Sequence, residues 1–150
     1  MDEKYRKLLE SCDEFGAYEF PSGFNYTTLE QDALDIERAL QKQFCLKTEF
    51  EGMMHNQDAS FSIAIILSDY IQKDKCGICR PSILFSNFGR LTTMTWSELL
   101  PKELTDQIPV ALDAKGFHYI PAEVLDADYD GVMKQVGNFR SWWLRYFDWL

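Results

Sequence analysis

The chain has 150 residues, of which 46% are hydrophobic and 26% are charged, and its formal net charge at pH 7 is −9. This length suits one domain with an ordinary hydrophobic core, and the apolar fraction excludes disorder over most of the chain. Because a negative field repels phosphate backbones and attracts cations, we expect no nucleic-acid partner and favour a basic protein partner.

The N-terminal residues lack the basic region and the apolar run of a secretory signal peptide. The longest apolar stretch, from Ile63 to Leu67, is too short to cross a bilayer. We therefore expect a cytoplasmic protein without membrane contact, whose four cysteines stay reduced.

Helices are expected in the first part of the chain. Residues 2–12 place their apolar side chains on one helical face. After a loop rich in glycine and proline, a clearer helix follows, which Thr27 or Thr28 is expected to cap and which should end near Gln43. Its apolar face repeats at helical spacing: Leu29, Ala33, Ile36 and Leu40.

The middle of the chain predicts four strands that form an antiparallel meander, at residues 44–50, 60–70, 82–88 and 91–96. The second strand is apolar on both faces, so we expect it to be central. Gly89 and Arg90 lie where a tight hairpin turn would join the last two strands.

The last third returns to helix. Residues 97–115 read as helical, with a kink or break at Pro109 and an end at Gly116. A short strand at 117–120 follows, then a short helix and loop, and a final helix at 139–150 capped by Asn138. The order α-α-β-β-β-β-α-β-α predicts a single α+β domain over residues 1–150. In it, helices pack on one face of an antiparallel sheet of four to five strands.

An acidic segment resembles the first half of a calcium-binding EF-hand loop, with carboxylates at positions one, three and five and a glycine at position six. The second half departs from that pattern, because Lys134 stands at position nine and Gly137 at position twelve. Either the segment binds calcium or it is an acidic surface turn that contacts a partner. The candidate partner-binding residues are Asp126, Asp128, Tyr129 and Asp130.

Cys76 and Cys79 form a C-x-x-C pair between two strand-like runs. Such a pair can bind zinc or exchange disulfides, but no second paired motif supplies further ligands and no helix begins at the pair. The other interpretation is a hairpin tip with two incidental thiols. Basic side chains at positions 73, 75 and 80 are expected to lower the pKa of these thiols.

Aromatic residues crowd the C-terminus, where Trp142 and Trp143 are adjacent and cannot point the same way from one helix. This segment either closes the core or binds a partner or a second copy. His55 and His118 have no serine or cysteine motif nearby, so no catalytic residue is assigned. An enzyme site assembled from distant residues stays an alternative.

In size, charge and element order the chain resembles two broad groups of proteins, the immunity proteins that neutralise bacterial toxins and the acidic, dimeric secretion chaperones. No motif specific to either group is present, so the resemblance assigns no residues. We predict a non-enzymatic acidic protein, without a cofactor, that docks a basic protein partner as an immunity protein does. The alternatives are a chaperone-like homodimer and a metal or redox module that uses Cys76 and Cys79.

Overall fold

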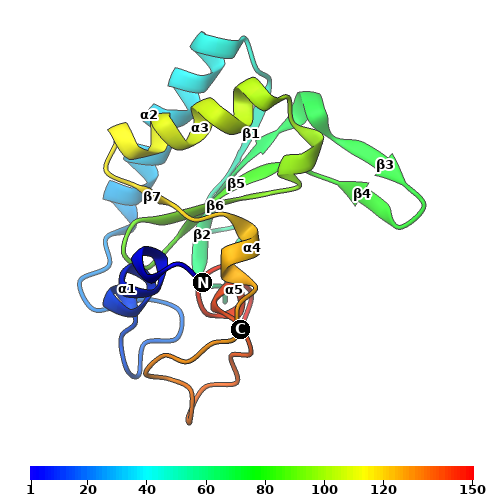
Figure 1. Cartoon of the computed structure of the whole chain (residues 1–150). Helices are drawn as coiled ribbons and strands as arrows, with labels where there is room; N and C mark the ends of the chain where they lie inside the picture. The colour runs from blue at the N-terminus through cyan, green and yellow to red at the C-terminus, as the bar shows by residue number, and fades with distance from the viewer.

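The computed structural model describes residues 1–150 as an α+β fold built around a mixed sheet (Figure 1). Helix α1 (Glu3–Cys12) is capped by the carboxylate of Asp2. Helix α2 (Tyr26–Phe44) is capped by Asn25, whose side chain accepts the backbone N–H of Thr28 at 3.1 Å. The predicted caps, Thr27 and Thr28, lie two and three residues too late, because asparagine is the stronger N-cap residue and precedes both threonines.

The central sheet has five strands in the order β1-β2-β5-β6-β7. The first four pair antiparallel in the order in which they occur, so the predicted meander is confirmed. Every residue of β2 is buried, as expected for a strand that is covered on both faces. The strands are β1 (Thr48–Glu51), β2 (Phe61–Leu67), β5 (Ser82–Ser86), β6 (Leu91–Thr95) and β7 (His118–Tyr119).

The predicted turn at Gly89 and Arg90 joins β5 to β6. Both residues have positive φ, 54° and 57°, as a type I′ hairpin turn requires. The N–H of Leu91 donates to the carbonyl of Phe88 at 3.0 Å and closes the turn. A Cβ on Gly89 would lie 2.0 Å from the Sγ of Cys12, so glycine also permits the close approach of α1.

Strand β7 corrects the prediction of a purely antiparallel sheet. It pairs parallel with β6, with Leu91 opposite His118 and Thr92 opposite Tyr119. Helix α3 (Lys102–Ala114) connects the two strands and returns the chain in the same direction, which is the crossover that parallel neighbours need. The sheet is therefore mixed.

A second small sheet was not predicted. Strands β3 (Gln72–Asp74) and β4 (Gly77–Cys79) form an antiparallel hairpin between β2 and β5. A 3-10 turn, η1 (Ser68–Tyr70), leads into it. Figure 1 shows that this hairpin projects away from the rest of the molecule, and every residue from 71 to 80 except Cys79 is exposed. We call residues 71–80 the hairpin arm.

Helix α3 follows a 3-10 turn, η2 (Ser97–Leu99), and runs through Pro109 without the predicted break. Proline removes one backbone donor, and packing on both sides of it holds the helix on the sheet. Gly116, with φ 75°, ends the helical segment as predicted. The buried side chains of α3 are Leu104, Ile108 and Leu112.

The C-terminal helices are shorter than predicted. Helix α4 (Ala122–Leu125) is one turn, and helix α5 (Trp142–Tyr146) is capped by Ser141 rather than by the predicted Asn138. After α5 the chain pairs with a distant segment instead of continuing as a helix. The N–H of Ser60 donates to Asp148 at 3.0 Å, and the N–H of Leu150 donates to Asp58 at 2.7 Å.

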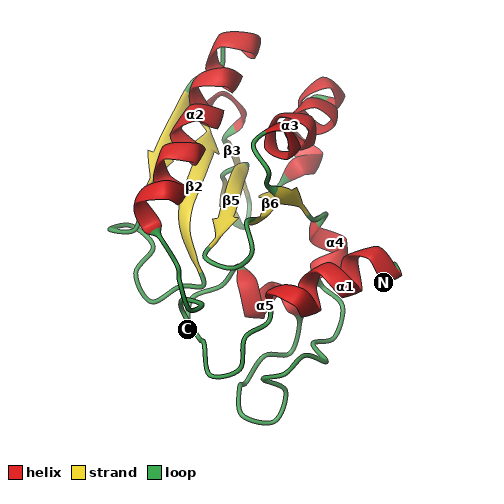
Figure 2. Ribbon diagram, turned by 90° about the vertical axis from the view of Figure 1, so that its left-hand side faces the viewer, coloured by secondary structure: helices red, strands yellow, loops and turns green.

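Helices cover both faces of the sheet, which corrects the prediction of helices on one face. One core lies between the sheet and helices α2 and α3, and a second core contains residues of α1, α4 and α5. Figure 2 shows α1, α4 and α5 gathered below the sheet, away from α2 and α3. The two cores follow from β2, whose Ile63 and Ile65 point to the first core while Ala64 points to the second.

A buried ion pair holds the second core together. The Nε of Arg145 donates to Asp13 at 2.8 Å, and both side chains are 0% exposed. Asp13 also accepts hydrogen bonds from the hydroxyl of Tyr129 and from the N–H of Val132. The network therefore joins three segments that are far apart in the sequence.

No helix of this fold combines the length and the apolar character that a membrane-spanning helix needs.

Candidate functional site

The helices of the second core leave part of their face of the sheet open. Two adjoining hollows of about 200 and 520 Å³ occupy this part, and they share Thr95 and Trp143 as lining residues. The sheet register places Ile66 beside Ser82 and Ser82 beside Thr95, so a continuous floor crosses β2, β5 and β6. The rest of this floor is apolar: Phe61, Ala64 and Leu84. We call the two hollows together the aromatic groove.

Aromatic side chains from two places in the sequence wall the groove. Trp143 projects from α5, Phe147 and Trp149 follow it, and Trp96 lies at the other end, directly after β6. Trp149 is 59% exposed and Trp96 is 46% exposed, which is unusual for the largest apolar side chain.

Trp96 adopts a left-handed backbone conformation, with φ 53° and ψ 34°. This conformation costs a residue other than glycine about 1–2 kcal/mol. Because strained residues concentrate where function constrains the chain, the backbone of Trp96 marks this end of the groove as a candidate contact point.

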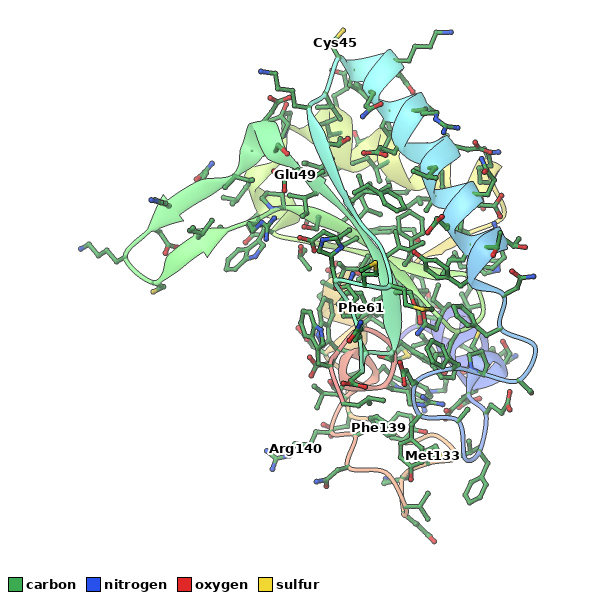
Figure 3. All side chains as sticks on the ribbon, turned by 180° about the vertical axis from the view of Figure 1, so that it is seen from behind. Cys45, Glu49, Phe61, Met133, Phe139 and Arg140 are labelled. Carbon is green, nitrogen blue, oxygen red and sulfur yellow. The ribbon has the colours of Figure 1, made fainter.

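The charges of the groove are predominantly negative. Its lining contains four carboxylates and a single cation, Arg80. Arg80 is already paired with Glu49 at 3.1 Å and with Glu51 at 3.5 Å. Figure 3 shows Glu49 at the base of the hairpin arm. The other three carboxylates make no ion pair: Glu98, Asp126 and Asp148.

This combination of aromatic rings and carboxylates suits the binding of a cationic side chain. The faces of tryptophan rings attract lysine and arginine, and nearby carboxylates add to that attraction. An apolar floor accommodates the aliphatic stem of the same side chains. The groove contains no histidine or cysteine that would act as a general base or nucleophile.

The four residues of the acidic turn have different surroundings. Asp126 lines the groove together with Trp96 and Trp143, whereas Asp128 is exposed and lines neither hollow. Asp130 forms an ion pair with Arg6. No group of three or more histidine, cysteine or acidic side chains is arranged to hold a metal ion, so the calcium interpretation gains no support.

Tyr129 is 3% exposed and therefore offers no surface to a partner. Its hydroxyl donates to Asp13 and accepts the N–H of Met133 at 2.8 Å. Burial and the neighbouring carboxylate of Asp13 raise the pKa of Tyr129 to about 12. Its role in this structure is to hold the turn against the second core.

Cys76 and Cys79 lie on the hairpin arm, Cys76 exposed and Cys79 buried. Burial and the carboxylate of Asp74, which accepts the Cys79 thiol at 3.4 Å, raise the pKa of Cys79. This direction is opposite to the predicted lowering by the neighbouring cations, because burial disfavours the thiolate and the adjacent charge is a carboxylate. With no further metal ligands nearby, the pair carries no metal proposal.

The histidines are placed apart from the groove. His55 is exposed on a hollow of about 590 Å³ beside β1, together with Glu30 and Tyr26. No serine, threonine or cysteine lines this hollow, so no nucleophile faces His55. His118 is exposed on β7. His55 therefore shares its hollow with the carboxylate of Glu30 but with no serine, threonine or cysteine.

Sequence reasoning identified Asp126 and the adjacent tryptophans but missed Trp96 and the buried Arg145. The pair Trp142 and Trp143 was a usable signal, since the first is fully buried and the second faces the groove. Trp96 gave no such signal, because left-handed backbone is expected at glycine or asparagine.

Comparison with known proteins gives no match to a protein-family model, to a curated protein or to a solved structure.

Proposed function

We propose that this chain is a non-enzymatic binding protein that captures a basic protein partner in its aromatic groove, as an immunity protein captures a toxin. The observation that carries the proposal is the combination of exposed tryptophans with carboxylates that have no ion-pair partner, around an apolar floor. Lysine and arginine side chains satisfy all three features of such a surface.

The net charge of −9 supports the same proposal at longer range. A negative surface steers a basic partner toward the groove and raises the association rate, and dissolved salt screens this attraction. Tryptophan is enriched among the residues that dominate binding energies, so Trp96, Trp143 and Trp149 are the expected anchors.

The test uses a fluorescein-labelled peptide of alternating lysine and leucine, with a glutamate–leucine peptide as its control. We expect the anisotropy of the lysine–leucine peptide to rise on binding and its association rate to fall as salt is added. The glutamate–leucine peptide should not bind. An association rate that does not depend on salt would contradict the proposal.

Single substitutions locate the binding surface. Asp126→Asn should weaken peptide binding several-fold, because Asp126 lines the groove without an ion-pair partner. Asp130→Asn should have a smaller effect, because Arg6 already neutralises that carboxylate. The matched control is Asp113→Asn, an exposed carboxylate on α3, which packs on the opposite face of the sheet. Equal effects of Asp126→Asn and Asp113→Asn would place binding outside the groove.

A further inference from the structure

The hairpin arm carries positive charge on an otherwise acidic protein. Lys73 and Lys75 are exposed and take part in none of the ion pairs of the structure. The one acidic side chain of the arm, Asp74, accepts the N–H groups of Cys76 at 2.7 Å and Gly77 at 3.0 Å. Asp74 is itself exposed, but the two lysines outnumber it, so the arm presents net positive charge.

The arm also presents apolar side chains. Ile78 is 57% exposed and lies directly opposite Lys73 in the hairpin register, so the two share one face. Ile71 is 36% exposed, two residues before Lys73, and alternation puts it on the same face. A two-stranded hairpin is only marginally stable alone, so exposed isoleucines beside lysines indicate a surface that another element covers.

The arm and the aromatic groove are neighbours with opposite charge. Arg80 ends the arm and also lines the groove, so the two surfaces meet at this residue. Figure 1 shows that the arm extends outward from the sheet instead of folding back over it. A chain therefore leaves its own groove open while it offers a complementary arm beside it.

We propose that two copies of this chain associate about a two-fold axis near Arg80, with the arm of each copy lying in the aromatic groove of the other. Lys73 and Lys75 would face Glu98 and Asp126, and Ile78 would lie between the tryptophans. A two-fold arrangement uses both contacts at once and closes without further growth. This inference goes beyond the proposed function, because the occupant is the protein itself and a foreign basic partner would compete with it.

The experiment is a charge exchange followed by sedimentation velocity at low salt. The molar mass of the natural protein in solution should be twice the 17.5 kDa of one chain, and the dimer should dissociate as salt is added. The double variant Lys73→Glu, Lys75→Glu reverses the charge of the arm. The double variant Glu98→Lys, Asp126→Lys reverses the charge of the groove. Each reversed protein should be a monomer, because its arm and groove then carry the same sign.

A mixture of the two reversed proteins should form a heterodimer, because both of its arm-to-groove contacts pair opposite charges. The control for the arm-reversed protein is the double variant Lys42→Glu, Lys134→Glu. It changes the net charge by the same amount at exposed sites outside the arm and should remain a dimer. Thermal unfolding confirms that each variant is folded. A monomeric natural protein, a dimeric arm-reversed protein, or a mixture that stays monomeric would each overturn the inference. Each of these results would leave the proposed function standing, because peptide capture by the groove of the natural protein is measured separately.

Discussion

At the scale of single residues, a buried polar network organises the half of the molecule that carries the groove. Arg145 contacts Asp13 through its Nε and lies over the ring of Phe88, 4.4 Å from its centroid. The hydroxyl of Tyr146 donates to the carbonyl of Leu9 at 2.7 Å. These contacts fix α5 against the N-terminal segment and so determine where Trp143 projects.

Removal of one partner of this ion pair should strongly destabilise the protein. Asp13→Asn leaves the guanidinium of Arg145 buried without its counter-charge, and we expect the free energy of unfolding to fall by about 3–5 kcal/mol. Urea unfolding measures this change. Lys102→Ala breaks the exposed Lys102–Asp106 pair and should cost about 0.5 kcal/mol or less. Similar costs for the two substitutions would contradict the assigned role of the network.

A buried tyrosine, Tyr129, and a half-buried one, Tyr119, make stability sensitive to high pH. Burial raises the pKa of Tyr119 and of Tyr129 from 10.0 to about 12, so the unfolded chain loses these protons before the folded protein does. Stability from these groups is fully present below pH 10 and is lost as pH rises toward 12. Urea unfolding across this range should show the decline, and tyrosinate absorbance should show late-titrating residues. Constant stability across this range would contradict the burial of both hydroxyls.

At the scale of elements, the sequence predicts the helices and strands that local residue patterns determine. It does not predict features that depend on contacts with distant segments. The meander follows from apolar alternation and from the turn residues Gly89 and Arg90. The direction of β7 has no local signature, because two residues carry no pattern and the crossover helix sets the direction. The last helix ends early because residues 58–60 offer backbone partners that the sequence does not reveal.

The groove likewise combines residues that the sequence indicates with an arrangement that depends on distant contacts. Asp126 was predicted from its acidic turn, and the aromatic C-terminus was recognised as either core or contact surface. The floor required knowledge of register across β2, β5 and β6, which the sequence does not give. Arg80 precedes β5 and Trp96 follows β6, and both of these strands were predicted. The position of Arg80 and Trp96 beside α5 depends on the packing of the second core.

Trp96, which lines the groove, and Trp142, which is buried, should respond differently to substitution. Trp96→Gly removes a half-exposed ring but releases left-handed backbone strain, so the free energy of unfolding should change by about 1 kcal/mol or less while peptide binding weakens. Trp142→Ala empties a fully buried site and should cost about 3–5 kcal/mol. Urea unfolding compares the two variants. A large loss of stability in Trp96→Gly would mean that this residue is structural.

At the scale of the whole molecule, charge and shape are unevenly distributed. The body is acidic and has an open aromatic groove, whereas the hairpin arm is basic, apolar and extended. A foreign basic partner and the arm of a second copy would use the same chemistry, so self-association and partner capture should compete and both should weaken with salt.

The central claim, that the groove binds cationic chains, is tested most directly by the four tryptophan indole N–H resonances in a ¹H–¹⁵N NMR spectrum. Three of these tryptophans line the groove: Trp96, Trp143 and Trp149. The fourth, Trp142, is 0% exposed and its indole N–H has no hydrogen-bond partner, so it serves as an internal control. On addition of the lysine–leucine peptide, the three groove resonances should shift together while that of Trp142 stays in place. Groove resonances that do not move, or that move equally with the glutamate–leucine peptide, would contradict the claim.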